Sequence, residues 1–197
     1  MTEAYQTISV MIFGAADSGK KTFIRAVRDT IPMTGEYQGK HPAHVTVAQD
    51  FGRMVVPGQP IVIYLFAIRS NLPWPPMEDT FSDETRRYAG YIVTVNSAPN
   101  RDWDEREQRE TLAVINTIRE RGLPFVIAAT KQDKPHARSA VQIRDLLQLP
   151  DDIKIIPCGA KTDPDSARRA LLELFALLPQ DNVIQHAQSA IRDMINK

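Results

Sequence analysis

Residues 7–30 have the sequence TISVMIF-GAADSGK-KTFIRAVRDT, in which a glycine-bearing loop separates two different kinds of segment. The apolar run before the loop is typical of a buried strand, and the segment after it is typical of an amphipathic helix. The loop, Gly14-Ala15-Ala16-Asp17-Ser18-Gly19-Lys20, has the G-x4-G-K pattern of a phosphate-binding loop. A chance glycine-bearing turn is the alternative, but the motif requires this strand–loop–helix context, which favours the phosphate loop.

Phosphate binding by such a loop has a direct physical basis. Glycines let the backbone wrap around the phosphates, and N–H groups from about Ala16 to Lys21 would point toward them at the start of a helix. The Lys20 ammonium would neutralise the terminal phosphate oxygens. We therefore predict that residues 14–22 bind the phosphate chain of a nucleotide.

Lys21 departs from the pattern, because the residue after the loop lysine is normally a Ser or Thr whose hydroxyl binds Mg²⁺. Thr22 supplies a hydroxyl one position later, but shifting the register would place Lys20 where a glycine must let the backbone approach the phosphate. An ammonium about 4 Å from a divalent cation is repelled by roughly 8 kcal/mol at an effective dielectric constant of 20. Lys21 must therefore swing away, displace the metal or take its place, and we expect little dependence on Mg²⁺.

Strand-like and helical segments alternate along the rest of the chain. This βαββαβαβα pattern predicts an α/β fold with a mostly parallel six-stranded sheet and helices on both faces. A hairpin around Pro57-Gly58-Gln59-Pro60 predicts one antiparallel edge strand. Strands are expected at residues 7–13, 45–56, 61–66, 91–95, 125–129 and 153–156, and helices at 19–30, 104–121, 138–147 and 166–178. We assign residues 1–178 to one domain and residues 179–197 to an amphipathic helical extension.

Two tetrapeptides, each at the end of a predicted strand, indicate which base the protein would bind. In Thr130-Lys131-Gln132-Asp133, the Asp133 carboxylate can accept two N–H bonds from guanine, and the stem of Lys131 can lie over the base. In Cys158-Gly159-Ala160-Lys161, the Ala160 N–H can bond the guanine carbonyl. Ligands of open α/β sheets bind at the carboxyl ends of the strands. The two segments, following a phosphate loop, predict GTP or GDP as the ligand.

With these three motifs, the chain resembles the Ras-like small GTPases over about residues 7–178. The segments Thr46-Val47-Ala48-Gln49-Asp50-Phe51-Gly52-Arg53 and Tyr64-Leu65-Phe66 are similar to the bacterial MglA-type branch. The resemblance implies a G domain of the P-loop NTPase class, with Thr46 reaching Mg²⁺ and the γ-phosphate. It also implies a signalling or polarity switch or scaffold, with a partner of the roadblock/longin type or a GTPase-activating protein.

The segment after the third strand departs from that branch, which has G-T-P-G-Q there. Here the chain has Ala67-Ile68-Arg69-Ser70-Asn71, so that Asn71 replaces the glutamine that positions water. We expect weak or absent hydrolysis, with Asn71 and Thr46 as the candidate catalytic residues. Two alternatives stay open: a working GTPase completed by Thr22, Asn71 or a partner, and an interaction module that has lost the nucleotide. An ATP-dependent enzyme is disfavoured by the guanine-type segments.

Composition excludes several other classes of protein. Of the 197 residues, 24 are Lys or Arg and 24 are Asp or Glu, and this balance argues against a nucleic-acid partner. Cys158 is the single cysteine, which excludes an internal disulfide and a cysteine-based zinc site. The sequence has no apolar run of membrane-spanning length. We expect a cytoplasmic protein without a signal peptide, membrane span or lipid anchor.

Overall fold

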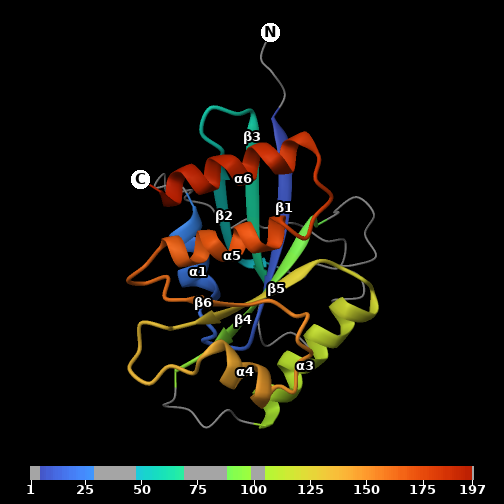
Figure 1. The fold of residues 1–197 in the computed structure, drawn as a ribbon, viewed down its shortest axis with the longest axis vertical. Helices are drawn as coiled ribbons and strands as arrows, with labels where there is room; N and C mark the ends of the chain where they lie inside the picture. The colour runs from blue at the N-terminus through green and yellow to red at the C-terminus, as the bar shows by residue number, and fades with distance from the viewer. Residues whose placement is uncertain (1–4, 29–47, 69–87, 99–104, 197) are drawn as a thin grey trace.

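A six-stranded sheet forms the centre of the protein (Figure 1). The computed structural model describes residues 5–28, 48–68, 88–98 and 105–196. The strands follow the spatial order β2-β3-β1-β4-β5-β6, and only the β2–β3 pair is antiparallel among them. Their bounds are β1 Gln6–Phe13, β2 Ala48–Val55, β3 Ile61–Ile68, β4 Gly90–Asn96, β5 Phe125–Thr130 and β6 Ile155–Cys158. The predicted mostly parallel sheet with one antiparallel edge strand is confirmed.

Helices cover both faces of this sheet, as the sequence predicts. One hydrophobic cluster joins the sheet to α1 (Lys20–Val27), α5 (Asp165–Phe175) and α6 (Asn182–Ile195). A second cluster joins the opposite face to α3 (Glu105–Glu120) and α4 (Ala140–Leu146). Along β1, Val10 and Ile12 belong to the first cluster while Met11 and Phe13 belong to the second, because successive strand side chains point to opposite faces. Such a two-faced strand must be apolar throughout, which explains the continuous apolar run.

The last strand differs from its predicted position. It spans residues 155–158 rather than 153–156, because Ile153 belongs to a turn in which its N–H donates to the Pro150 carbonyl oxygen. The Ile153 carbonyl accepts a hydrogen bond from Arg144 Nη2 at 2.8 Å. Ile153 is nevertheless buried in the second cluster. An apolar turn residue therefore looked like a strand residue in the sequence.

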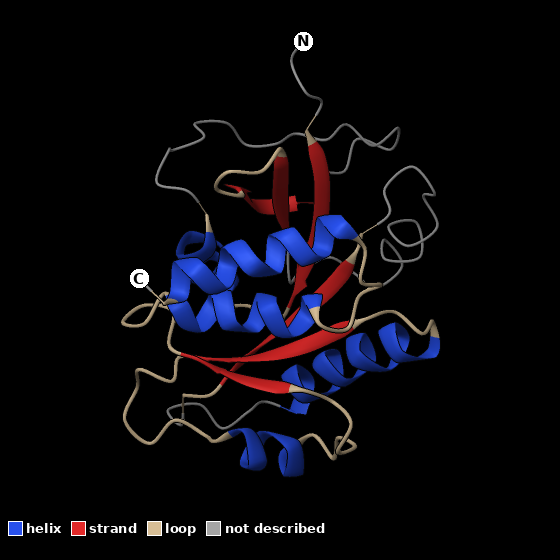
Figure 2. Ribbon diagram, turned by 45° about the horizontal axis from the view of Figure 1, so that its top comes forward, coloured by secondary structure: helices blue, strands red, loops and turns tan. Residues whose placement is uncertain are grey.

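The C-terminal helix α6 packs on the body of the fold. Asp181 caps its N-terminus, where Oδ1 accepts a hydrogen bond from the Ile184 N–H at 2.8 Å. Ile184, Ala187 and Ile191 are buried in the first cluster, and Figure 2 shows α6 beside α5 over the sheet. The apolar stripe expected on this segment thus covers part of the core. None of the helices among the described residues is long and apolar enough to cross a membrane.

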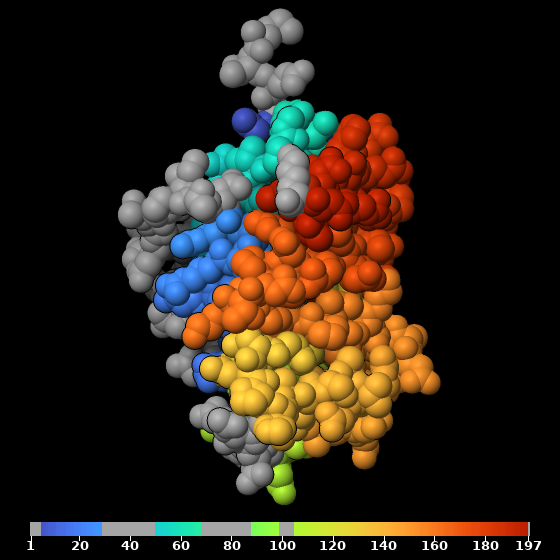
Figure 3. Space-filling model, turned by 60° about the vertical axis from the view of Figure 1, so that its left-hand side comes forward, coloured from blue at the N-terminus to red at the C-terminus, as the bar shows by residue number. Residues whose placement is uncertain are grey.

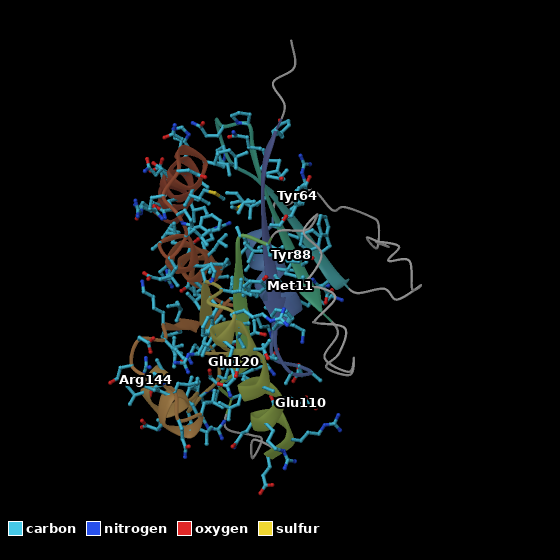
Figure 4. All side chains as sticks on the ribbon, turned by 90° about the vertical axis from the view of Figure 1, so that its right-hand side faces the viewer. Met11, Tyr64, Tyr88, Glu110, Glu120 and Arg144 are labelled. Atoms are coloured by element: carbon cyan, nitrogen blue, oxygen red, sulfur yellow. The ribbon has the colours of Figure 1, made fainter. Side chains whose placement is uncertain are left out.

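Half-buried aromatic side chains line the face of β2 and β3 that points away from α5 and α6. Tyr64 stacks on Phe51, their ring centroids being 5.6 Å apart, and Tyr88 meets the edge of Phe66 at 5.8 Å. Figure 4 shows Met11, Tyr64 and Tyr88 on this side of the sheet. These contacts stabilise the end of the sheet that carries the antiparallel strand.

The sheet reverses its strand order at β1. From β1 the chain first builds β3 on one side and later β4 on the other. In open α/β sheets the crevice for a ligand lies at such a point, beyond the carboxyl ends of the strands. The loop that begins at Gly14 leaves β1 at this place.

Candidate functional site

Three residues of the loop from Gly14 to Gly19 have a positive φ, which residues other than glycine rarely adopt. Gly14 has a φ of 149° and Gly19 a φ of 93°, and Asp17 adopts the left-handed region with a φ of 60°. A Cβ at Gly14 would lie 2.2 Å from Thr94 Oγ1 and 2.5 Å from the Thr94 carbonyl oxygen. Gly14 is therefore required both by its conformation and by its contact with β4.

Two buried hydroxyl groups attach this loop to the sheet. Thr94 Oγ1 donates a hydrogen bond to the Phe13 carbonyl at 2.8 Å, and it lies 2.7 Å from Ser18 Oγ. Because the Thr94 proton is used on Phe13, Ser18 must be the donor in the second bond. Both side chains are at most 1% exposed, so these bonds are shielded from water. Thr94 was missed by the sequence analysis, and its position inside an apolar strand is the only signal of its role.

Lys20 is folded back over the loop that precedes it. Its Nζ donates hydrogen bonds to the carbonyl oxygens of Gly14 at 2.7 Å and Ala15 at 2.8 Å, and the residue is only 8% exposed. Burial away from water lowers the pKa of Lys20 from 10.5 to about 8, although Asp50, Asp17 and Glu107 attract its charged form. The loop thus holds a partly desolvated cation whose charge an anion would stabilise.

Lys21 points away from this loop cation. Its Nζ lies 3.9 Å from Asp50 Oδ1 on β2, and 61% of its side chain is exposed. Of the three possibilities that the sequence left open, the structure adopts the first, in which Lys21 swings away. An ammonium paired with a carboxylate is not a ligand set for Mg²⁺, which requires oxygen ligands in a compact octahedral arrangement. The side chains of Lys20 and Lys21 therefore do not fit a metal at this position.

The segment after β5 is fastened to the glycine-bearing loop by two contacts. Thr130 is buried, and its Oγ1 donates to the Ser18 carbonyl oxygen at 2.6 Å. Lys131, which also has a left-handed φ of 60°, places its Nζ 2.7 Å from Asp17 Oδ2. A Cβ at Gly19 would lie 3.1 Å from Thr130 Oγ1, which shows how closely the two backbones approach. Neither the contact of Thr130 with Ser18 nor that of Lys131 with Asp17 was predicted.

The segments after β5 and β6 are also linked to each other. The Gln132 N–H donates to the Cys158 carbonyl oxygen at 3.3 Å, and a Cβ at Gly159 would lie 3.5 Å from the Asp133 nitrogen. Cys158 is fully buried, its sulfur lies 3.6 Å from Ser166 Oγ, and burial raises the pKa of the thiol. Cys158 therefore acts as a small packing residue, since a nucleophile would need a lowered pKa.

A cavity of about 140 Å³ lies between these three segments. From the glycine-bearing loop and α1 come Asp17, Gly19 and Thr22, while the segment after β5 gives Thr130, Lys131 and Asp133. Figure 3 shows α1 in blue next to α5 in orange on this side of the molecule, with the yellow residues that follow β5 below them. The remaining lining residues are Lys134, Cys158, Ala160 and Lys161.

The cavity contains many of the residues that the sequence analysis selected, but not all of them. The predicted residues that lie outside its lining are Gly14, Ala15, Ala16, Ser18, Lys20, Lys21 and Gly159. Lys134 was not predicted, although it directly follows Asp133. The candidate catalytic residues Thr46 and Asn71 lie outside the described residues.

No protein-family model matches this chain, and a search of curated proteins found no match either. The resemblance to Ras-like small GTPases therefore stays a prediction.

Proposed function

We propose that this protein binds the guanine nucleotides GTP and GDP through a Ras-like G domain and hydrolyses GTP slowly or not at all. One observation carries the proposal: a loop of phosphate-binding pattern and both base-type segments line one cavity at the carboxyl edge of a parallel sheet. The loop is more than 100 residues of sequence away from both base-type segments. All three follow parallel strands and so reach one edge of the sheet, and there residues of all three line the same cavity, at the edge where α/β sheets bind ligands.

In this proposal the phosphates bind at the N-terminus of α1. The positive φ values of Gly14 and Gly19 let the loop curve at the end of β1, and the start of the helix contributes a partial positive charge. Lys20 is held on the Gly14 and Ala15 carbonyl oxygens, so its ammonium already lies at this loop. Preorganisation of this kind lowers the entropic cost of binding.

Asp133 is the residue proposed to recognise the guanine base. A carboxylate can accept hydrogen bonds from the N1–H and the amino group of guanine, whereas an adenine edge offers an unprotonated N1 at the corresponding place. Asp133 lines the cavity together with Ala160, whose N–H is the proposed donor to the guanine carbonyl. A site that is built to hydrogen-bond one edge rejects a base that leaves those groups unpaired.

Slow hydrolysis follows from the charge arrangement next to the loop. Phosphoryl transfer depends on positioned groups that stabilise charge on the transferring phosphate, a task usually shared with Mg²⁺. The Lys21–Asp50 pair does not fit that metal, so we propose that this protein binds the nucleotide but hydrolyses it slowly or not at all. By the resemblance, a cytoplasmic switch or scaffold role with a roadblock/longin-type partner or a GTPase-activating protein belongs to the same proposal.

Two measurements test the proposed function. The purified protein is denatured and any released nucleotide is identified by ion-exchange chromatography, and calorimetry then compares GDP with ADP on nucleotide-free protein. We expect the native protein to bind GDP more tightly than ADP. Asp133→Ala should lower the affinity for GDP by at least roughly tenfold, because hydrogen bonds to a charged group contribute about 1.5–3 kcal/mol each. Asp152→Ala, at an exposed carboxylate in the loop before β6, is the matched control. Equal affinities of the native protein for GDP and ADP would overturn the proposal.

A further inference from the structure

Asp17 places a carboxylate inside a loop that is proposed to bind phosphates. Its side chain is 72% exposed and it lines the cavity, so a bound polyanion would meet its charge. Taken alone, this arrangement opposes phosphate binding, since like charges in a partly exposed site repel one another. The structure shows what offsets that charge: Lys131 Nζ lies 2.7 Å from Asp17 Oδ2.

We propose that Asp17 and Lys131 form a clasp with two effects on the nucleotide. Asp17 is a positioning residue that holds the Lys131 side chain along the cavity wall, where its stem can lie over the base. Lys131 in return neutralises Asp17, so that the loop accepts phosphates. This inference rests on the proposed guanine-nucleotide function and deepens it by coupling recognition of the base to tolerance of the phosphates.

The geometry of the two residues supports a built contact. Both have a left-handed φ of 60°, a conformation that is uncommon for residues other than glycine and that persists where surrounding contacts impose it. The contact joins residues 114 positions apart in the sequence. The adjacent bond from Thr130 Oγ1 to the Ser18 carbonyl fixes both backbones beside it. A contact between two flexible surface side chains would not need an uncommon backbone conformation at both residues.

The Lys131 ammonium is suited to its neutralising role because it is less exposed than its partner. Its side chain is 24% exposed, so it loses less to solvent and salt than a fully exposed lysine would. Lys134 and Lys161 also line the cavity, but the structure pairs Asp17 with Lys131. Loss of Lys131 therefore has two consequences: the base loses its stacking surface, and the Asp17 charge is released toward the phosphates.

A double-substitution cycle separates these two consequences. We expect Lys131→Gln to lower the affinity for both guanosine and GDP. The affinity for GDP should fall more, because guanosine has no phosphate for Asp17 to repel. Adding Asp17→Asn to Lys131→Gln should restore GDP affinity by about threefold, in the range measured for exposed charge pairs, and should leave guanosine affinity unchanged. Asp17→Asn alone should weaken the affinity for guanosine, because Lys131 loses its charged anchor.

The experiment measures calorimetric affinities of the native protein, the two single variants and the double variant for GDP and guanosine, at low and high salt. The matched control is Lys154→Gln with Glu173→Gln, a Lys–carboxylate ion pair away from the cavity whose side chains are also partly exposed, which should change neither affinity. The restoration should also shrink at high salt, where such interactions are screened.

Each result decides the proposal. A double variant that regains affinity for GDP but not for guanosine supports the clasp. If adding Asp17→Asn to Lys131→Gln restores the affinities for both ligands equally, or restores neither, the clasp is overturned even when the native protein prefers GDP to ADP. Failure of the native protein to prefer GDP overturns the proposed function itself and the clasp with it.

Discussion

Raising the pH through about 8 should weaken GDP binding, because Lys20 would lose the charge that meets the phosphates. The pKa of Lys20 is lowered to about 8 in the ligand-free protein, where the side chain is 8% exposed. Bound phosphates would raise this pKa again, since an adjacent anion favours the charged form. The contribution of Lys20 to binding is therefore complete below about pH 8 and is lost as the pH rises from the free pKa toward the bound one.

The magnitude follows from the fraction of Lys20 that is charged. At pH 9, one unit above a pKa of about 8, roughly one tenth of the ligand-free protein carries the ammonium. GDP affinity should then be about tenfold lower at pH 9 than at pH 7. The stability of the ligand-free protein depends on pH in the opposite direction. Between about pH 8 and pH 10.5 the unfolded chain binds more protons at Lys20 than the native protein does, so this group makes the native state more stable as the pH rises.

The assay is calorimetric titration of GDP and guanosine from pH 7 to pH 9.5, in two buffers of different ionisation enthalpy so that proton uptake is measured directly. Guanosine is the control, because it experiences the titration of guanine itself but offers no phosphate to Lys20. Lys20→Arg is the second control, since an arginine stays charged throughout and should flatten the GDP profile. A native GDP profile that matches the guanosine profile, or that is as flat as the arginine variant's, would refute the reasoning.

Three further predictions concern the supports of the site and the core. Ile191→Ala should lower the free energy of unfolding by about 2–5 kcal/mol in chemical denaturation, because the side chain is fully buried, whereas the exposed Ser189→Ala on the same helix should change it little. Gly14→Ala should abolish GDP binding, while Gly58→Ala, in a turn with open space around it, should leave binding intact and cost only about 1–2 kcal/mol of stability. Lys21→Thr should make GTP affinity sensitive to EDTA and speed single-turnover hydrolysis, and native affinity that falls as steeply in EDTA would contradict the prediction.

Much of the fold could be predicted because local patterns and burial agree along the chain. The β1 run is apolar at every position since both of its faces are covered, and the turn at residues 57–60 sets the antiparallel edge pair. The loop motif is local as well, because its glycines serve the conformation of the residues beside them. Ile153 shows the limit of such patterns, since burial of a turn residue and burial of a strand residue look alike in a sequence.

The sequence by itself determined the kinds of element, their order and the three segments that carry the proposed chemistry, because propensity and hydrophobic period act over neighbouring residues. Only the tertiary structure decided the strand order and the partners of three lysines. Lys20 donates to the loop carbonyls, Lys21 lies beside Asp50, and Lys131 contacts Asp17. These depend on which segments meet in space and on how much water is excluded where they meet. A charged side chain has the same letter whether it is solvated, buried or paired, and its partner is set by packing between residues that are distant in the chain.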